Sequence, residues 1–179
     1  MKIFRLALLS IITAFVIITA SAQQGISQGI PSHIETVYTQ TSSNTSIPLR
    51  VPSIIPLNSP AAPINYWASN ISRDNFYSIS FNRAADCSGV EECSFASVSG
   101  EINTEASRNY QQQLIRPRVE QITLNDGTPA IFSPHYEGIY GTSSVYVQID
   151  EYLYTFSIYM ADQADVVAMA NSALSVFSQ

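Results

Sequence analysis

The stretch from residue 144 to residue 159 constrains the fold more than any other, because it predicts a hairpin in one register. With the tip at Asp150-Glu151, one face of the strand pair carries polar side chains such as Gln148, Thr155 and Ser157. The other face pairs Ile149 with Tyr152, Val147 with Tyr154, and Val145 with Phe156. A shift of one residue would mix the two faces. The stretch therefore predicts an antiparallel strand pair with one buried face.

Alternating and turn-forming residues predict further strands. These strands are expected at residues 75–81, 94–99, 119–124 and 128–132. The last two read as a hairpin with Asp126-Gly127 as its turn, because Gly tolerates the positive φ that a tight turn requires. This turn would place Ile122 opposite Ile131.

Two helices complete the predicted fold. Residues 103–116 have apolar side chains at helical spacing and stop at Pro117, and residues 162–177 have an apolar stripe with Asp162 as the N-cap. Together these elements predict an α+β fold: an antiparallel sheet of about five or six strands, with the C-terminal helix and one more helix packed on one face.

Residues 1–22 have the layout of a cleavable secretory signal peptide. Lys2 and Arg5 precede an apolar run, and Ala20-Ser21-Ala22 forms a cleavage pattern of small residues. The apolar run falls short of the roughly 20 residues that span a bilayer, so we expect cleavage before Gln23 and no stable membrane anchor afterwards. The predicted location is secreted or periplasmic.

The next segments are expected to differ in order. Residues 23–46 are rich in Ser, Thr, Gln and Gly with few apolar anchors, which predicts a flexible arm. Residues 47–56 repeat proline every four residues, which excludes a helix or a central strand and suits an extended edge segment. A single domain is therefore expected from residue 47 to residue 179.

The charge balance excludes several classes of partner. The formal net charge is −6, and loss of Lys2 and Arg5 with the signal peptide would change it to −8. Of the eight Lys and Arg residues, six would remain, all arginine, against fourteen carboxylates. Such a chain lacks a basic surface for nucleic-acid phosphates or anionic lipid headgroups. A protein, a peptide or a glycan of the cell envelope is the expected partner, and the oligomeric state stays open.

Cys87 and Cys93 are the only cysteines, and an exported protein meets an oxidising compartment. We expect a structural disulfide, because a metal site would need more thiols or histidines at ligand spacing and a redox pair more often has two intervening residues. The carboxylates of Asp86, Glu91 and Glu92 lie in the same loop without the pattern of a calcium-binding loop. No metal or cofactor is therefore predicted.

His135 and Glu137 form the one candidate centre for catalysis. They lie in a loop between the predicted hairpins, where a base and a carboxylate could serve hydrolysis or hold a metal. An exposed loop histidine is the favoured interpretation, because the chain has neither a G-x-S-x-G nucleophile motif nor an H-E-x-x-H zinc motif. No catalytic residue is assigned.

Tyrosine is abundant, with ten in the chain. A flat ring with a polar tip can contact a glycan or a peptide at low entropic cost. Since Tyr152 and Tyr154 belong to the predicted core face, the candidate binding platform consists of Tyr136, Tyr140 and Tyr146.

The order of these features resembles uncharacterised secreted proteins of cyanobacteria and, more loosely, a bacterial extracytoplasmic domain of unknown function. The resemblance covers about residues 47–174, from the proline-rich entry to the Ala-Asn-Ser-Ala part of the last helix. Asp150-Glu151 departs from it, since relatives usually have a glycine at this tip. The resemblance implies fold and location, and it implies no catalytic residue.

Two functions from different classes follow. The first is a secreted or periplasmic, non-enzymatic binding module of unknown specificity. The alternative is an envelope hydrolase or metal-dependent enzyme centred on His135 and Glu137. A purely structural role in the envelope is not separated from partner binding by the sequence.

Overall fold

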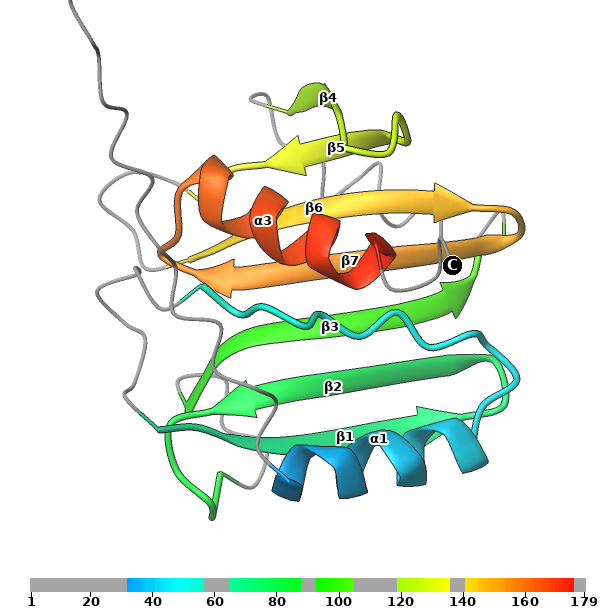
Figure 1. Cartoon of the computed structure of the whole chain (residues 1–179), viewed down its shortest axis with the longest axis vertical. Helices are drawn as coiled ribbons and strands as arrows, with labels where there is room; N and C mark the ends of the chain where they lie inside the picture. Colours follow the sequence, from blue (N-terminus) through cyan, green and yellow to red (C-terminus); the bar gives the residue numbers. More distant parts are fainter. Residues whose placement is uncertain (1–31, 57–64, 88–92, 105–118, 136–140, 176–179) are drawn as a thin grey trace, which may run out of the picture.

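Seven antiparallel strands form one sheet in the computed structural model, which describes residues 32–56, 65–87, 93–104, 119–135 and 141–175 (Figure 1). Their order across the sheet is β1-β2-β3-β7-β6-β5-β4. The strands are β1 (Trp67–Arg73), β2 (Phe76–Asn82), β3 (Ser94–Ile102), β4 (Glu120–Thr123), β5 (Pro129–Ser133), β6 (Thr142–Ile149) and β7 (Tyr152–Tyr159). The helices are α1 (Ser32–Ser43) and α3 (Gln163–Leu174). The α+β prediction is confirmed, with seven strands where about five or six were expected.

The predicted register of the β6–β7 hairpin is confirmed. Ile149 lies opposite Tyr152, Val147 opposite Tyr154 and Val145 opposite Phe156. The last two pairs are at most 1% exposed, so this face belongs to the core. Asp150 at the tip takes φ 54°, a left-handed conformation that asparagine and aspartate adopt more readily than most residues.

The β4–β5 hairpin is confirmed, but its predicted register was wrong by one residue. Ile122 lies opposite Ala130, and Ile131 lies opposite Gln121. Leu124 and Thr128 close the turn, with the Leu124 amide donating to the Thr128 carbonyl at 2.9 Å. Three residues therefore form the loop, and Gly127 takes the positive φ of 88° as the last of them.

The two helices and residues 47–56 lie on the same side of the sheet (Figure 1). We call this side, which carries Ile79, Val98 and Phe156, the covered face. The other side is called the hydroxyl face because Ser80, Ser97 and Ser157 lie on it. The covered face holds the core, since Ile79, Val98 and Phe156 are all 0% exposed.

Helix α3 packs on β6 and β7, as expected of the C-terminal helix. Its N-cap is Asp162, whose carboxylate accepts a hydrogen bond from the Asp165 amide at 3.0 Å. Val166, Met169 and Ala170 on its inner side are fully buried. Apolar burial against the sheet, together with the cap, stabilises this helix.

Helix α1 shows that the prediction of a flexible arm was wrong for residues 32–46. Ile34, Val37 and Tyr38 share one helical stripe, and Ile34 is 0% exposed. The buried Thr41 hydroxyl accepts a hydrogen bond from the side-chain amide of Asn70 on β1 at 2.8 Å. A few apolar anchors suffice here because the sheet supplies the other side of the contact. Residues 1–31 lie outside the described residues.

Residues 47–56 form neither a helix nor a central strand, as predicted, but they do not lie at an edge. They cross the covered face beside α3 (Figure 1). The buried Tyr154 hydroxyl donates to the Pro48 carbonyl at 3.0 Å, and the Tyr77 hydroxyl accepts from the Arg50 amide at 3.0 Å. Core tyrosines thus satisfy the backbone of this segment, which allows it to lie against the sheet.

Most of the helix predicted at residues 103–116 lies outside the described residues. Asn103 and Thr104 are described and are not helical. The second described helix is therefore α1, which the sequence did not predict. Neither helix in the described ranges has the length and apolar character needed to cross a membrane.

Candidate interaction surface

A row of serines crosses the hydroxyl face from β1 to β5. Each serine lies opposite the next one on the neighbouring strand: Ser69, Ser80, Ser97, Ser157, Ser144 and Ser133. Five strand spacings of about 4.8 Å make this row about 24 Å long. Along this row, the described strands present only small hydroxyl side chains.

Exposure differs along this row. Ser144 and Ser157 are only 8% and 9% exposed, and their hydroxyls are 2.8 Å apart. Ser69 on β1 is exposed, and Ser80 on β2 is half-buried. The most accessible serine of the row is therefore Ser69, on β1.

Strand β1 carries the largest exposed apolar side chains of the hydroxyl face in the described residues. Ile71 is 64% exposed and Trp67 is 37% exposed, and Ser69 lies between them on the same face. Every hydroxyl-face residue of β1 is exposed, whereas the alternate residues are half-buried against α1 and the core. An exposed Ile and Trp on one strand are the residues that a partner would cover most favourably.

Strand β1 was not predicted from the sequence. Its half-buried face has only Ala68, Asn70 and Ser72, and its two large apolar residues lie on the exposed face, so the usual pattern of a half-buried strand is missing. The two-residue turn Asp74-Asn75 was an available signal, because Asp and Asn favour turns directly before the predicted strand at residues 75–81.

Only one residue of the predicted tyrosine platform lies in the part of the chain that the structure describes. Tyr146 lies on the hydroxyl face of β6, opposite Thr155, and it is half-buried with an interaction partner. Tyr136 and Tyr140 lie outside the described residues, so the platform stays a prediction. Tyr154 is 1% exposed on the covered face, in agreement with its assignment to the core.

Buried phenols keep their protons. Burial raises the pKa of Tyr77 well above its ordinary value of 10, and burial likewise raises the pKa of Tyr38. The neutral Tyr77 hydroxyl accepts the hydrogen bond from the Arg50 backbone amide. These groups stabilise the fold and are not available as acids near neutral pH.

His135 contacts a buried serine. Its Nδ1 lies 3.0 Å from Ser143 Oγ, and its backbone amide donates to the same oxygen at 3.2 Å. The Ser143 hydroxyl donates to the Ala161 carbonyl at 2.7 Å, and Ser143 is 0% exposed. Because the only hydroxyl proton is directed at Ala161, the ring contact requires Nδ1 to carry a proton. His135 therefore acts here as a donor to Ser143 and does not activate the Ser143 hydroxyl.

Glu137, the other half of the candidate catalytic centre, lies outside the described residues. Among the residues that are described, no three His, Cys, Asp or Glu side chains come together as metal ligands. Within the described ranges, the structure therefore shows no three-residue metal site at His135.

A shallow groove of about 740 Å³ runs beside α3 toward the β4–β5 turn. Ala164, Val167 and Ala168 contribute apolar surface, and Asp126 is the one carboxylate in its lining. The Thr128 amide donates to Asp126 at 2.9 Å, and this bond lowers the pKa of the carboxyl. One carboxylate without a second titratable group does not form an acid–base pair.

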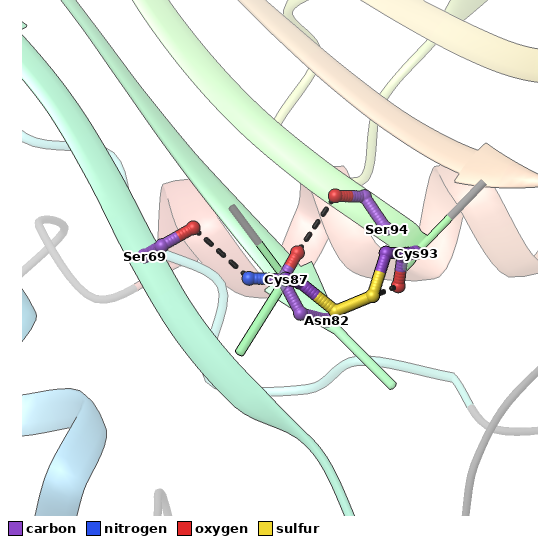
Figure 2. Close-up of a disulfide and its surroundings, with 5 residues drawn as sticks. All are labelled: Ser69, Asn82, Cys87, Cys93 and Ser94. Atoms are coloured by element: carbon purple, nitrogen blue, oxygen red, sulfur yellow. Dashed lines mark hydrogen bonds between the residues drawn. A yellow bond between two sulfur atoms is a disulfide. The ribbon is translucent and has the colours of Figure 1, made fainter. Parts of the chain in front are cut away.

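Cys87 and Cys93 form the predicted disulfide in the connection between the end of β2 and the start of β3 (Figure 2). Beside it, the buried Asn82 side chain donates to Ser69 at 2.9 Å and accepts from Ser94 at 2.7 Å. These contacts join three strands next to the bridge. The disulfide is compatible with an oxidising compartment. Asp86 is exposed, and residues 88–92 lie outside the described residues.

No protein-family model, no curated protein and no solved structure matches this chain. The resemblance to secreted cyanobacterial proteins therefore stays a prediction, and the function has to be argued from the surface of the molecule.

Proposed function

We propose that this protein is an exported, non-enzymatic binding module that contacts a protein, peptide or glycan of the cell envelope. The observation that carries the proposal is the exposure of Trp67 and Ile71 on the hydroxyl face of β1. We assign the contact surface to these two side chains and the neighbouring Ser69 and Ser80.

The chemistry of this surface suits a partner. Burying exposed apolar area contributes about 25 cal/mol per Å², and Trp is among the residues that dominate interface energies. The adjacent hydroxyls can donate and accept hydrogen bonds at the rim of such a contact. A surface of this composition favours binding over chemistry.

Export is supported by the layout of residues 1–22 and is compatible with the disulfide. A protein that works outside the cytoplasm meets envelope proteins and glycans as its neighbours. The proposed partner classes follow from this location.

The alternative function, a hydrolase or metal-dependent enzyme centred on His135 and Glu137, receives less support. The hydroxyl nearest to His135 belongs to the fully buried Ser143, which already donates to Ala161. A serine nucleophile must be accessible, with its proton directed at the base. We therefore assign no catalytic role.

The test is a retention assay with protein purified from cells that express the full chain. The protein is immobilised, envelope extract and a glycan array are applied, and any captured component is identified, purified and bound again. The Ile71→Asp variant should lose retention, because a charge replaces the most exposed apolar side chain of the surface.

Ile54→Asp is the matched control, since Ile54 is 46% exposed on the segment that crosses the covered face. It should bind as the wild type does. The proposal is wrong if the wild type retains neither a protein nor a glycan, or if Ile71→Asp and the wild type bind alike.

A further inference from the structure

We infer, on the basis of the function proposed above, that the outer edge of β1 binds an extended peptide segment of a partner protein. The segment would join the sheet as one more strand beside β1. This names the partner class and the main-chain chemistry that recognises it.

The backbone of β1 offers unpaired groups to such a strand. Arg73 and Phe76 are the closing pair of the two-residue turn Asp74-Asn75, and a closing pair of this kind exchanges both hydrogen bonds. Counting back in steps of two, Ile71, Ser69 and Trp67 also bond to β2.

The alternate residues Ala68, Asn70 and Ser72 therefore direct their N–H and C=O groups away from β2. Strand β1 is the last strand of the sheet, and no other strand of the described chain pairs with its outer side. Within the described ranges, the backbones of these three residues make no other main-chain hydrogen bond. Only an extended polypeptide presents the alternating donors and acceptors that match this edge.

Strand β1 has few of the features that protect natural edge strands. It has seven residues, an unbroken register with β2, and neither proline nor bulge, and its one charged residue is Arg73 at the end of the strand. At the opposite edge, β4 has only four residues and includes the exposed Glu120. The long, regular edge is therefore the one suited to receive a strand.

Helix α1 favours a peptide over a second copy of this chain. It contacts β1 from the covered face, where Thr41 bonds to Asn70, and Figure 1 shows it at the border of the sheet. Antiparallel pairing of two copies through β1 would bring both α1 helices to the same side of a shared edge. Neighbouring strands lie about 4.8 Å apart, whereas a helix with side chains is about 10 Å wide, so the two helices would collide.

A single strand without its own helix avoids this collision. On the hydroxyl face its side chains would lie beside Trp67, Ser69 and Ile71, because cross-strand neighbours share a face. Apolar or β-branched side chains at alternate positions of the peptide would cover Ile71, the most exposed of these residues. The bound segment is thus expected to alternate between apolar and polar residues.

The probe is an array of fluorescein-labelled synthetic heptapeptides in which β-branched and polar residues alternate, with binding measured by fluorescence anisotropy. Wild-type protein should bind a subset of them. Ser72→Pro removes an N–H that points outward and leaves the hydrogen bonds to β2 in place. This variant should weaken binding about tenfold, as expected for a lost main-chain bond plus a steric clash at the edge.

Ser72→Ala is the matched control, because it changes the same side chain and keeps the N–H. It should bind as the wild type does, and thermal melts should show that both variants are folded. Amide exchange of the wild-type protein gives a second readout that needs no variant. The peptide should protect the amides of Ala68, Asn70 and Ser72.

The outcomes separate this inference from the proposed function. If envelope retention depends on Ile71 but no heptapeptide binds, the edge inference is overturned and the proposed function stands. Binding that Ser72→Pro leaves unchanged, or amide protection elsewhere in the chain, also overturns the inference. If neither envelope components nor peptides bind, both proposals fail.

Discussion

Gly100 on β3 lies directly opposite Tyr77 on β2, and the ring of Tyr77 occupies the space above it. A β-carbon built at Gly100 would fall inside van der Waals contact with this ring. Tyr77 is 0% exposed and bonds to the Arg50 amide, so it has little freedom to move. The glycine thus allows a core tyrosine to reach the segment that crosses the sheet.

We expect Gly100→Ala to lower the free energy of unfolding by about 2 kcal/mol, the usual cost of overpacking a core site. Urea denaturation measures this change. Ser99→Ala, on the half-buried hydroxyl face, is the control and should change stability by less than about 0.5 kcal/mol. Equal stability of the wild type and Gly100→Ala would show that the Tyr77 ring is not fixed as described.

Tyr38 and Tyr77 predict loss of stability at high pH. Burial raises their pKa values in the folded state above the ordinary value of 10. A raised folded pKa means that the stabilisation is complete below pH 10 and is lost as the pH rises through the folded value. The free energy of unfolding should therefore fall above pH 10, with a smaller slope in Tyr77→Phe. Stability that stays constant from pH 9 to pH 12 would contradict this account.

At the scale of elements, the strands that were predicted correctly are those with strong side-chain contrast. The β6–β7 register follows from large apolar residues on one face and polar residues on the other. Strand β1 and helix α1 lack this contrast, and they stabilise each other through a contact such as Thr41 with Asn70. Such a contact joins residues far apart in the chain, so no local pattern reveals it.

The candidate surface could be predicted only in small part for the same reason. Tyr146 was selected because tyrosine is abundant and because it lies outside the predicted core face, and the structure places it on the hydroxyl face. The exposure of Ile71, by contrast, depends on which strands neighbour β1. A row of serines becomes visible only when the register of six strands is known. Residue type alone therefore did not reveal the surface.

At the scale of elements, the disulfide is a covalent link between β2 and β3. Its cysteines are six positions apart, and closing so short a loop contributes about 2 kcal/mol through the entropy of the unfolded chain. We expect the Cys87→Ser/Cys93→Ser double variant to lose about this much stability in urea denaturation. The same loss should appear when the wild type is measured with a reducing agent, and reductant should not affect the double variant. A double variant as stable as the wild type would show that the disulfide does not stabilise the fold.

At the scale of the whole molecule, one face of the sheet carries the core and both described helices, and the other face ends at β1 with exposed apolar groups. The exposed residues of β1 are therefore the part of this second face that is free to contact a partner. Export would place that second side in contact with envelope components.

Export itself has a direct test. Cells expressing the full chain should contain a protein whose first residue is Gln23, outside the cytoplasm, as shown by fractionation and N-terminal sequencing. Replacing Ala20 and Ala22 by bulky residues should retain residues 1–22, because cleavage requires small side chains at these positions. An intact N-terminus in the cytoplasmic fraction would refute the export prediction.

The most direct test of the proposed function is hydrogen–deuterium exchange of the protein with and without its purified envelope partner. The account predicts that protection on binding is concentrated in β1, from Trp67 to Arg73, and extends to the adjacent residues of β2. Protection confined to the groove beside α3, or to the loop that contains His135, would contradict it.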